Sequence, residues 1–278
     1  MVAEDFQVAK DSRKISKNIL ERKGAVRVAE VPKNVLKLLN QGKIETKNLC
    51  ETLAVNQVLL YKNVLKELKI DKKEYRDLFK KSDAKIMTLL RQGALAFFAI
   101  SKKEENILPK ISNHQSDIIR SYATFITVHL KANSFPKRAK LVEPFAADSH
   151  VSVKECAWMS LRPFIVEDFK KALPTLKKWA KSKDANIRRC AIEATRPRGV
   201  WCEHFELLKQ KPELAESLIS IVHNDQSKYV QNSVANWLND ASKNKPKFVR
   251  NTIKKWTKMS DSRQTAYITK RASRTLRA

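Results

Sequence analysis

The apolar residues of this chain recur every three or four positions along almost its whole length, which is the spacing of an amphipathic α-helix. Two early stripes show the pattern: Val35, Leu36, Leu38 and Leu39, then Leu49, Leu53, Leu60, Val64 and Leu68. No stretch alternates polar and apolar residues for long enough to predict a β-strand. Most of the nine prolines are expected between helices, where a missing N–H costs least. The pattern therefore predicts an all-α protein.

A longer repeat lies in the second half, where four segments align on a β-branched residue with a mostly small residue four positions later. The segments 116–123, 149–157, 183–191 and 225–234 align on Ile119, Val153, Ile187 and Val230, which are 34, 34 and 43 positions apart. Each segment follows a polar turn and is expected to open a helix. The spacing predicts stacked helix pairs of HEAT-like type in a right-handed α-solenoid, with a generic helical bundle as the alternative.

We expect one all-α domain over residues 1–278, with a helical lead-in over 1–80 and the HEAT-like repeats over 81–278. A stacked-helix solenoid has a concave face with its own row of side chains. Residues just after each turn would line one edge of that groove and bind a phosphate backbone: Arg120, Lys154, Arg188 and Arg189.

Composition and charge limit the classes of fold and partner that this chain can have. The chain has 4 glycines, so glycine-rich phosphate loops and dinucleotide-binding folds are excluded. The formal net charge is +27, from 56 Lys and Arg against 29 Asp and Glu. A charge of this size indicates a polyanionic partner, with nucleic acid favoured over an acidic membrane surface. A lysine-rich composition without function is the alternative.

The remaining composition predicts an intracellular protein without a metal site. Four widely spaced cysteines form no CxxC pair, and two of them, Cys156 and Cys190, are expected to be buried thiols. The histidines form no HxxxH pair, so no metal is expected. No apolar run is long enough to span a membrane, and residues 1–14 contain no apolar leader. A cytoplasmic location follows as the default expectation.

Two helices of the repeat array contain candidate acids. Glu155 is acidic where the other repeats carry serine, arginine or asparagine, although an ordinary solvated or arginine-paired carboxylate is the favoured interpretation from sequence alone. Arg189 and Glu193 are four residues apart and therefore share a helix face.

The turn after Glu193 is a candidate DNA contact. Pro197 ends the helix, and Arg196, Arg198 and Gly199 form a basic turn that is followed by Trp201. Two arginines and an aromatic ring could bind a DNA backbone, and a scarce glycine indicates a conformational requirement. The alternative is that Trp201 packs in the core.

A further candidate region is the sequence NWLND, which contains Trp237 and Asp240. At a groove edge the two side chains would lie together and face DNA. Spacing alone favours a core position for Trp237 and a surface position for Asp240.

The strings NIRRCAIEATRPRGVW (186–201) and KYVQNSVANWLNDASK (228–243) closely resemble the AlkC branch of the bacterial alkylpurine DNA glycosylases. The wider superfamily, with its AlkD branch, has an all-helical HEAT-like fold. The resemblance is strongest over about residues 82–278, and the stretch 22–49 is similar to the helical lead-in of the same family. Some relatives carry an immunoglobulin-like C-terminal domain, which this chain is expected to lack. Arg188 and Arg189 match an arginine pair that the family places at the DNA backbone.

The resemblance also implies catalytic roles. Asp240 stands where the family has an acid proposed to act on the sugar, and Glu193 and Trp201 stand where it has an acid and an active-site tryptophan. Glu155 is our choice for a further family acid. Alkylation at N3 of adenine makes the base a cationic leaving group, and a carboxylate near C1′ stabilises the oxocarbenium-like sugar that remains.

These features predict a monofunctional DNA glycosylase that acts as a monomer on double-stranded DNA and needs no cofactor. The expected substrate is 3-methyladenine, with 3-methylcytosine or 1-methyladenine as further candidates. A non-catalytic HEAT-repeat scaffold that binds DNA is the first alternative. A HEAT adaptor for another protein is the second, and it agrees poorly with the charge.

Overall fold

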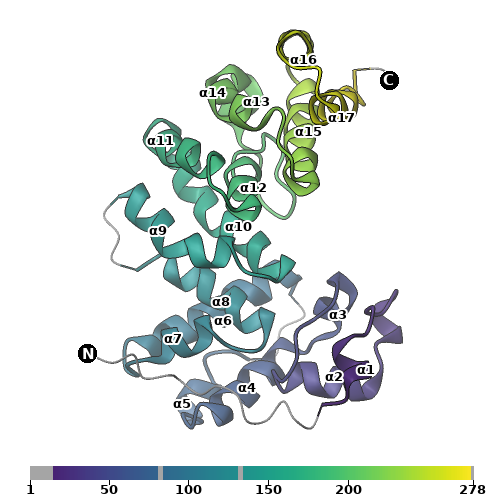
Figure 1. The fold of residues 1–278 in the computed structure, drawn as a ribbon. Coiled ribbons are helices and arrows are strands. Elements are labelled where there is room, and N and C mark those ends of the chain that lie inside the picture. Colours follow the sequence, from purple (N-terminus) through teal and green to yellow (C-terminus); the bar gives the residue numbers. More distant parts are fainter. Residues whose placement is uncertain (1–14, 81–83, 131–133, 277–278) are drawn as a thin grey trace, which may run out of the picture. The chain divides into compact units, whose positions relative to one another are not determined.

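The computed structural model describes residues 15–80, 84–130 and 134–276, and the regular structure in these ranges is helical throughout (Figure 1). Residues 1–14, in which no leader is expected, lie outside the described part. The chain divides by its internal contacts into two compact units, 1–123 and 124–278, so the division falls later than residue 80. A single domain over the whole chain stays a prediction. None of the described helices combines the length and the hydropathy needed to cross a membrane.

The first unit contains short helices around an aromatic core. They are α1 (Lys17–Leu20), η2 (Val28–Glu30), α2 (Lys33–Asn40), α3 (Leu49–Ala54), α4 (Gln57–Glu67), α5 (Lys73–Arg76), α6 (Ile86–Ser101), α7 (Ile107–Ser112) and the first part of α8 (Asp117–Thr127). The buried ring of Tyr61 packs edge-on against Phe79 and Phe97. Buried polar contacts connect the loops to this core, because Thr46 donates to the Asp117 carboxylate through its N–H and its hydroxyl.

The second unit contains the repeat array. Its helices are α9 (Phe135–Ala146), α10 (Val151–Glu167), α11 (Phe169–Ala180), α12 (Ala185–Glu193), α13 (Glu206–Gln210), η3 (Pro212–Ala215), α14 (Glu216–Ile219), η4 (Ser220–Val222), α15 (Lys228–Ser242), α16 (Pro246–Met259) and α17 (Arg263–Ala272).

Contacts between these helices arrange them in two layers (Figure 1). In one layer, here called layer B, α10 packs on α12, α12 on α15, and α15 on α17. In the other, layer A, α9 packs on α11 and α11 on α14, and an ion pair between Lys255 and Glu216 (2.8 Å) connects α16 to α14. Each layer covers the other, since α9 packs on α10, α11 on α12 and α16 on α15. This is the helix-pair stacking that the repeat predicts.

The alignment of the four repeat segments is confirmed residue by residue. The helices α8, α10, α12 and α15 each begin two positions before the aligned β-branched residue. Ile119, Val153, Ile187 and Val230 are all buried, and so are the residues four positions later. The small residue at the second position allows close approach of the neighbouring helix in the pairs that stack.

The prolines differ from the expectation. Pro144, Pro163 and Pro174 lie inside α9, α10 and α11 rather than between helices. A proline inside a helix removes one backbone hydrogen bond, and tertiary packing can outweigh that loss. The expectation was correct for Pro197, which follows α12, and Pro246 stands in the first turn of α16, where the lost donor is unpaired in any helix.

Candidate functional site

Helices of layer B and the segment after α12 bring five charged side chains into one network in which acids and arginines alternate. We call Glu155, Arg189, Glu193, Arg196 and Asp240 the ion-pair network. An Arg189 Nη lies 2.5 Å from Glu155 and 3.7 Å from Glu193. The guanidinium of Arg196 lies 3.2 Å from Glu193 and 2.8 Å from Asp240. The prediction that Arg189 and Glu193 share one helix face is therefore confirmed.

The two acids that share Arg196 differ in how their oxygens are occupied. Glu193 is 4% exposed, and it accepts hydrogen bonds from Ser233 Oγ at Oε1 (2.6 Å) and from Arg196 at Oε2 (3.2 Å). Asp240 accepts from Arg196 Nε (2.9 Å) and Nη2 (2.8 Å) at one oxygen, Oδ2. Its Oδ1 is 3.6 Å from the ammonium of the half-exposed Lys243. Asp240 thus has the more available carboxylate oxygen.

Glu155 is the arginine-paired carboxylate that the sequence alone favoured. Its second oxygen accepts a hydrogen bond from Trp158 Nε1 at 2.7 Å. The guanidinium of Arg189 stacks over the ring of Tyr229 at 4.2 Å. Burial raises the pKa of Tyr229 to about 12, against the opposing effect of Arg189, so this hydroxyl stays protonated at neutral pH.

The electrostatics of the network are nearly balanced. Burial alone would lower the pKa of Arg196, but the charges of Glu193 and Asp240 outweigh burial and raise it. Arg189 follows the same pattern: burial alone would lower its pKa, but the charges of Glu155 and Glu193 outweigh burial and raise it. The arginines are therefore held as cations by the acids beside them, and any attraction for DNA phosphates must come largely from other cations.

Asp240 was expected at the surface, and this expectation is wrong: the residue is 5% exposed. Helix spacing shows which side of α15 Asp240 occupies, but the side chain of Arg196, from the segment after α12, covers it. Trp237 is 0% exposed, and its Nε1 donates to the Thr195 carbonyl at 3.0 Å. A fully buried ring has no surface for DNA, so the predicted DNA contact of Trp237 is wrong and its core interpretation is correct.

The segment 195–205, here called the Trp201 loop, follows α12. Trp201 is 52% exposed and has a φ of 66°, a left-handed backbone that bulky residues rarely adopt. The ring therefore lies outside the core, contrary to the core alternative. Gly199 has no room for a side chain, because a Cβ there would lie 2.2 Å from Cys202 Sγ. Arg198 donates to Asn244 Oδ1 at 2.8 Å, which connects the loop to the end of α15.

The polar residues after each turn have a structural function that the sequence did not indicate. The residue after each aligned β-branched position donates to backbone carbonyls of the preceding turn. The donors are Arg120 (to His114 and Gln115), Lys154 (to Ser149), Arg188 (to Ser182 and Lys183) and Gln231 (to Asp225 and Gln226), at 2.8 to 3.5 Å. These four residues are here called the turn-binding positions.

Two turn-binding arginines are also paired with acids. Arg120, which is buried in the first unit, lies 2.5 Å from Glu45. Arg188 donates to both oxygens of Asp225, at 2.6 and 2.9 Å, and this hydrogen bonding raises its pKa. Both side chains are occupied within the protein, so binding of a phosphate by Arg120 or Arg188 would have to replace these bonds, and this role stays a prediction.

Replacing Arg188 by methionine is therefore expected to affect folding more than DNA binding. The change removes charge-assisted bonds to Asp225 and two carbonyls, so we expect the free energy of unfolding to fall by about 1.5–3 kcal/mol. Urea unfolding measures this loss, and fluorescence anisotropy with a DNA duplex measures affinity. The matched control is Lys183→Met, which removes an exposed cation one turn away. If Arg188→Met unfolded with normal stability but bound DNA much more weakly, the predicted contact of Arg188 with a DNA phosphate would be supported.

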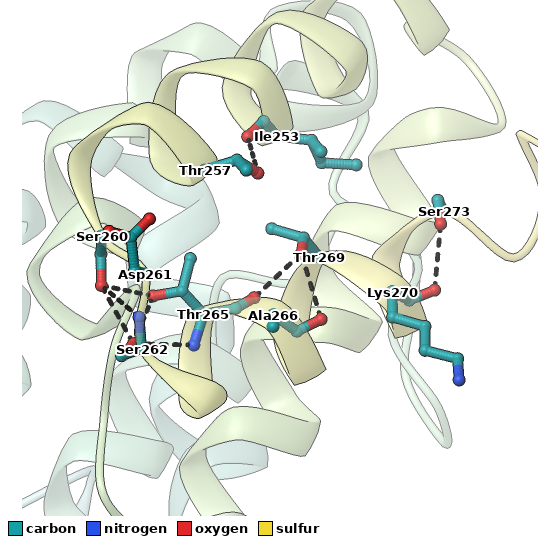
Figure 2. A pocket seen from close by; sticks show the side chains of 10 residues that line it. All are labelled: Ile253, Thr257, Ser260, Asp261, Ser262, Thr265, Ala266, Thr269, Lys270 and Ser273. Atoms are coloured by element: carbon teal, nitrogen blue, oxygen red, sulfur yellow. Dashed lines mark hydrogen bonds between the residues drawn. The ribbon is translucent and has the colours of Figure 1, made fainter.

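A pocket between α16 and α17 lies apart from the network (Figure 2). Its volume is about 480 Å³, and its lining includes the hydroxyls of Ser260, Ser262, Thr265 and Thr269. These hydroxyls bond to one another or to the backbone, and Ser262 caps α17 (Figure 2). Their hydrogen-bonding capacity is used within the fold, so this pocket is not the candidate site.

Four residues that contact or support the network were missed by sequence reasoning. Trp158 and Lys243 stand three positions after Glu155 and Asp240, so helix spacing could have found them. Ser233 and Arg162 reach their partners across helices or into the Trp201 loop, and no local spacing indicates that. Among the described residues, no group of three or more side chains is arranged to hold a metal ion.

Residues 147–276 match the model of a family described as DNA alkylation repair enzyme. These residues are here called the alkylation repair segment. The alkylation repair segment includes the whole ion-pair network and the Trp201 loop. A relative among known proteins, the uncharacterized protein YhaZ of Bacillus subtilis (strain 168), is 38% identical over 87 residues, which are 31% of this chain and 24% of YhaZ.

Two solved structures share the fold. The Pseudomonas fluorescens alkylpurine DNA glycosylase AlkC, bound to DNA containing an abasic site analog, matches with a TM-score of 0.65 and 21% identity over 79% of this chain and 62% of that chain. AlkD2 from Streptococcus mutans matches with a TM-score of 0.57 and 23% identity over 77% of this chain and 98% of that chain. The predicted all-helical solenoid of HEAT-like repeats is thereby confirmed, whereas the concave basic groove stays a prediction.

Proposed function

We propose that this protein is a monofunctional DNA glycosylase that hydrolyses the N-glycosidic bond of alkylated bases in duplex DNA. The observation that supports this most is the ion-pair network, in which acids from three successive layer-B helices meet inside the alkylation repair segment. The proposed substrate is 3-methyladenine, with 3-methylcytosine and 1-methyladenine as further substrates. The protein would act as a monomer.

Asp240 is the proposed catalytic carboxylate. The bond between C1′ and the cationic base breaks, and the base leaves with the bonding electrons as a neutral molecule. A positive charge remains on the sugar, and a negative oxygen near C1′ stabilises it. Oδ1 of Asp240 can fill this role, because Arg196 occupies Oδ2. A water molecule then adds to C1′ and gives its proton to the Asp240 carboxylate, so the proposed reaction involves neither a metal nor a redox cofactor.

DNA binding would free Oδ1 of Asp240 by drawing Lys243 away from it. Its ammonium is half exposed and 3.6 Å from Asp240 Oδ1, a long contact that a DNA phosphate can replace. Trp201, which is 52% exposed, is proposed to contact the deoxyribose or the cationic base, where cation–π attraction would add about 0.5–2 kcal/mol. Glu193, with both oxygens occupied, is proposed to hold Arg196 in place.

A specific observation favours the second candidate, a DNA-binding scaffold without catalysis. All three candidate acids are paired with arginines, as acids with a purely structural role would be. Such a scaffold would bind duplex DNA and release no base.

Chromatography of bases released from methylated duplex DNA separates these two functions. With protein in molar excess over lesions, we expect 3-methyladenine to appear as free base and an abasic site to remain in the strand. The excess protein removes any limit from slow product release. Tight binding of the same duplex without any released base would reject the glycosylase and support the scaffold.

A further inference from the structure

Arg162 of α10 is a buried cation with an unusual set of partners. It is 3% exposed, and its two Nη atoms donate to the carbonyls of Ala194 (3.1 Å), Arg196 (2.9 Å) and Glu203 (3.0 Å). Among the described residues no carboxylate forms an ion pair with it. Burial is the main cause of its lowered pKa. Because a buried charge is costly, the three carbonyls must compensate for lost water.

The three carbonyls lie at the end of α12 and near the two ends of the Trp201 loop. Ala194 and Arg196 stand where the loop leaves α12, and Glu203 stands where it returns. The ring of Phe205 lies 5.6 Å from the guanidinium, and the Phe205 N–H donates to the Pro197 carbonyl at 2.9 Å. Arg162 therefore connects the beginning and the end of one loop from the inside.

Arginine suits this position better than lysine. A guanidinium is planar and directs five N–H donors along fixed directions, so it can reach several separate acceptors. An ammonium group is a single nitrogen atom and cannot span both ends of the loop. The backbone of Gly199 also approaches the guanidinium, since a Cβ there would lie 3.3 Å from Arg162 Nη2.

We propose that Arg162 is a positioning residue that presets the Trp201 loop before DNA binds. Its hydrogen bonds to the loop go to backbone carbonyls rather than to side chains. The carbonyl of Arg196 bonds to Arg162 while the Arg196 side chain contacts Glu193 and Asp240, so one residue connects the loop to the network. Trp201 lies farther along the same loop, with its ring outside the core. A preset loop avoids the entropy that a mobile loop would lose on binding.

The loop can be observed without any enzymatic reaction. Of the five tryptophans in the chain, Trp158, Trp179, Trp237 and Trp256 are buried and Trp201 is half exposed. Acrylamide quenching of tryptophan fluorescence, after subtraction of the signal of Trp201→Phe, therefore reports on Trp201. We expect Arg162→Met and Arg162→Lys to raise its quenching constant by about twofold as the loop loosens. Arg138→Met, which removes another arginine stacked on a phenylalanine, is the matched control and should leave it unchanged.

A double-mutant cycle then separates positioning from general stability. Trp201→Ala is expected to weaken binding of an abasic-site duplex by about tenfold in the wild type and to have little further effect in Arg162→Met. Urea unfolding checks that each variant is folded, and Gly199→Ala, which crowds the same site, is the second variant if Arg162→Met does not fold. Unchanged quenching together with additive losses would overturn the proposal. The quenching and the binding do not depend on base release. A failure of the glycosylase proposal would therefore not change the outcome of this test.

Discussion

Asp240→Asn is expected to slow the release of alkylated base by about 100-fold or more while leaving affinity for an abasic-site duplex nearly unchanged. The amide keeps the shape of the carboxylate but lacks the negative charge that stabilises the sugar cation. Single-turnover release of 3-methyladenine measures the chemical step, and fluorescence anisotropy measures binding. A loss in rate without a loss in affinity is the signature of an interaction made in the transition state.

The matched control is Asp261→Asn, the same chemical change at an exposed acid in the pocket between α16 and α17. The variant Glu193→Gln is measured beside it. Because Glu193 is proposed to act through Arg196, we expect this variant to slow the release of base less than Asp240→Asn does. Release at the wild-type rate from both Asp240→Asn and Glu193→Gln would remove the network from the chemistry.

Arg196→Met is expected to give the largest loss of stability in the second unit, about 3–5 kcal/mol in the free energy of unfolding. The change leaves Glu193 and Asp240, each about 5% exposed or less, without the cation between them. Two like charges then remain in a poorly hydrated site, and this repulsion adds to the cost of burial. Urea unfolding followed by far-ultraviolet circular dichroism measures the loss.

Arg198→Met is the control for this experiment. Arg198 lies on the same loop two positions later, but its partner is the amide of Asn244 rather than a buried carboxylate. We expect it to cost about 1 kcal/mol. Equal losses for the two variants would show that the loop, rather than the buried acids, determines the cost of removing Arg196.

The sequence was sufficient for the helices, the repeat alignment and part of the network. Ile119, Val153, Ile187 and Val230 could be found because periodicity and burial act locally along a helix. The shared helix face of Arg189 and Glu193 followed from the same spacing. Asp240 was wrongly expected at the surface because its cover comes from Arg196, 44 positions earlier in the chain. Helix spacing carries no information about a side chain from so distant a segment.

Arg162 shows a signal that was present but not used. It stands among apolar residues of a helix, in the string MSLRPFIV, where a charge must find buried partners. The sequence indicates that a partner is needed but does not identify it, because the acceptors are backbone carbonyls that any residue supplies. The catalytic assignments of Asp240, Glu193, Trp201 and Glu155 stay predictions until the variants are measured.

The turn-binding positions have a consequence for how such proteins diverge. Arginine, lysine and glutamine at these positions all donate to a backbone carbonyl of the turn, so Gln231 binds the turn without the charge that Arg188 carries. Mutations at this position can therefore change the isoelectric point of a repeat protein while its inter-helix geometry is retained. Selection for solubility or for binding partners can therefore change the net charge at these positions. Relatives that differ in net charge can then keep the same backbone fold.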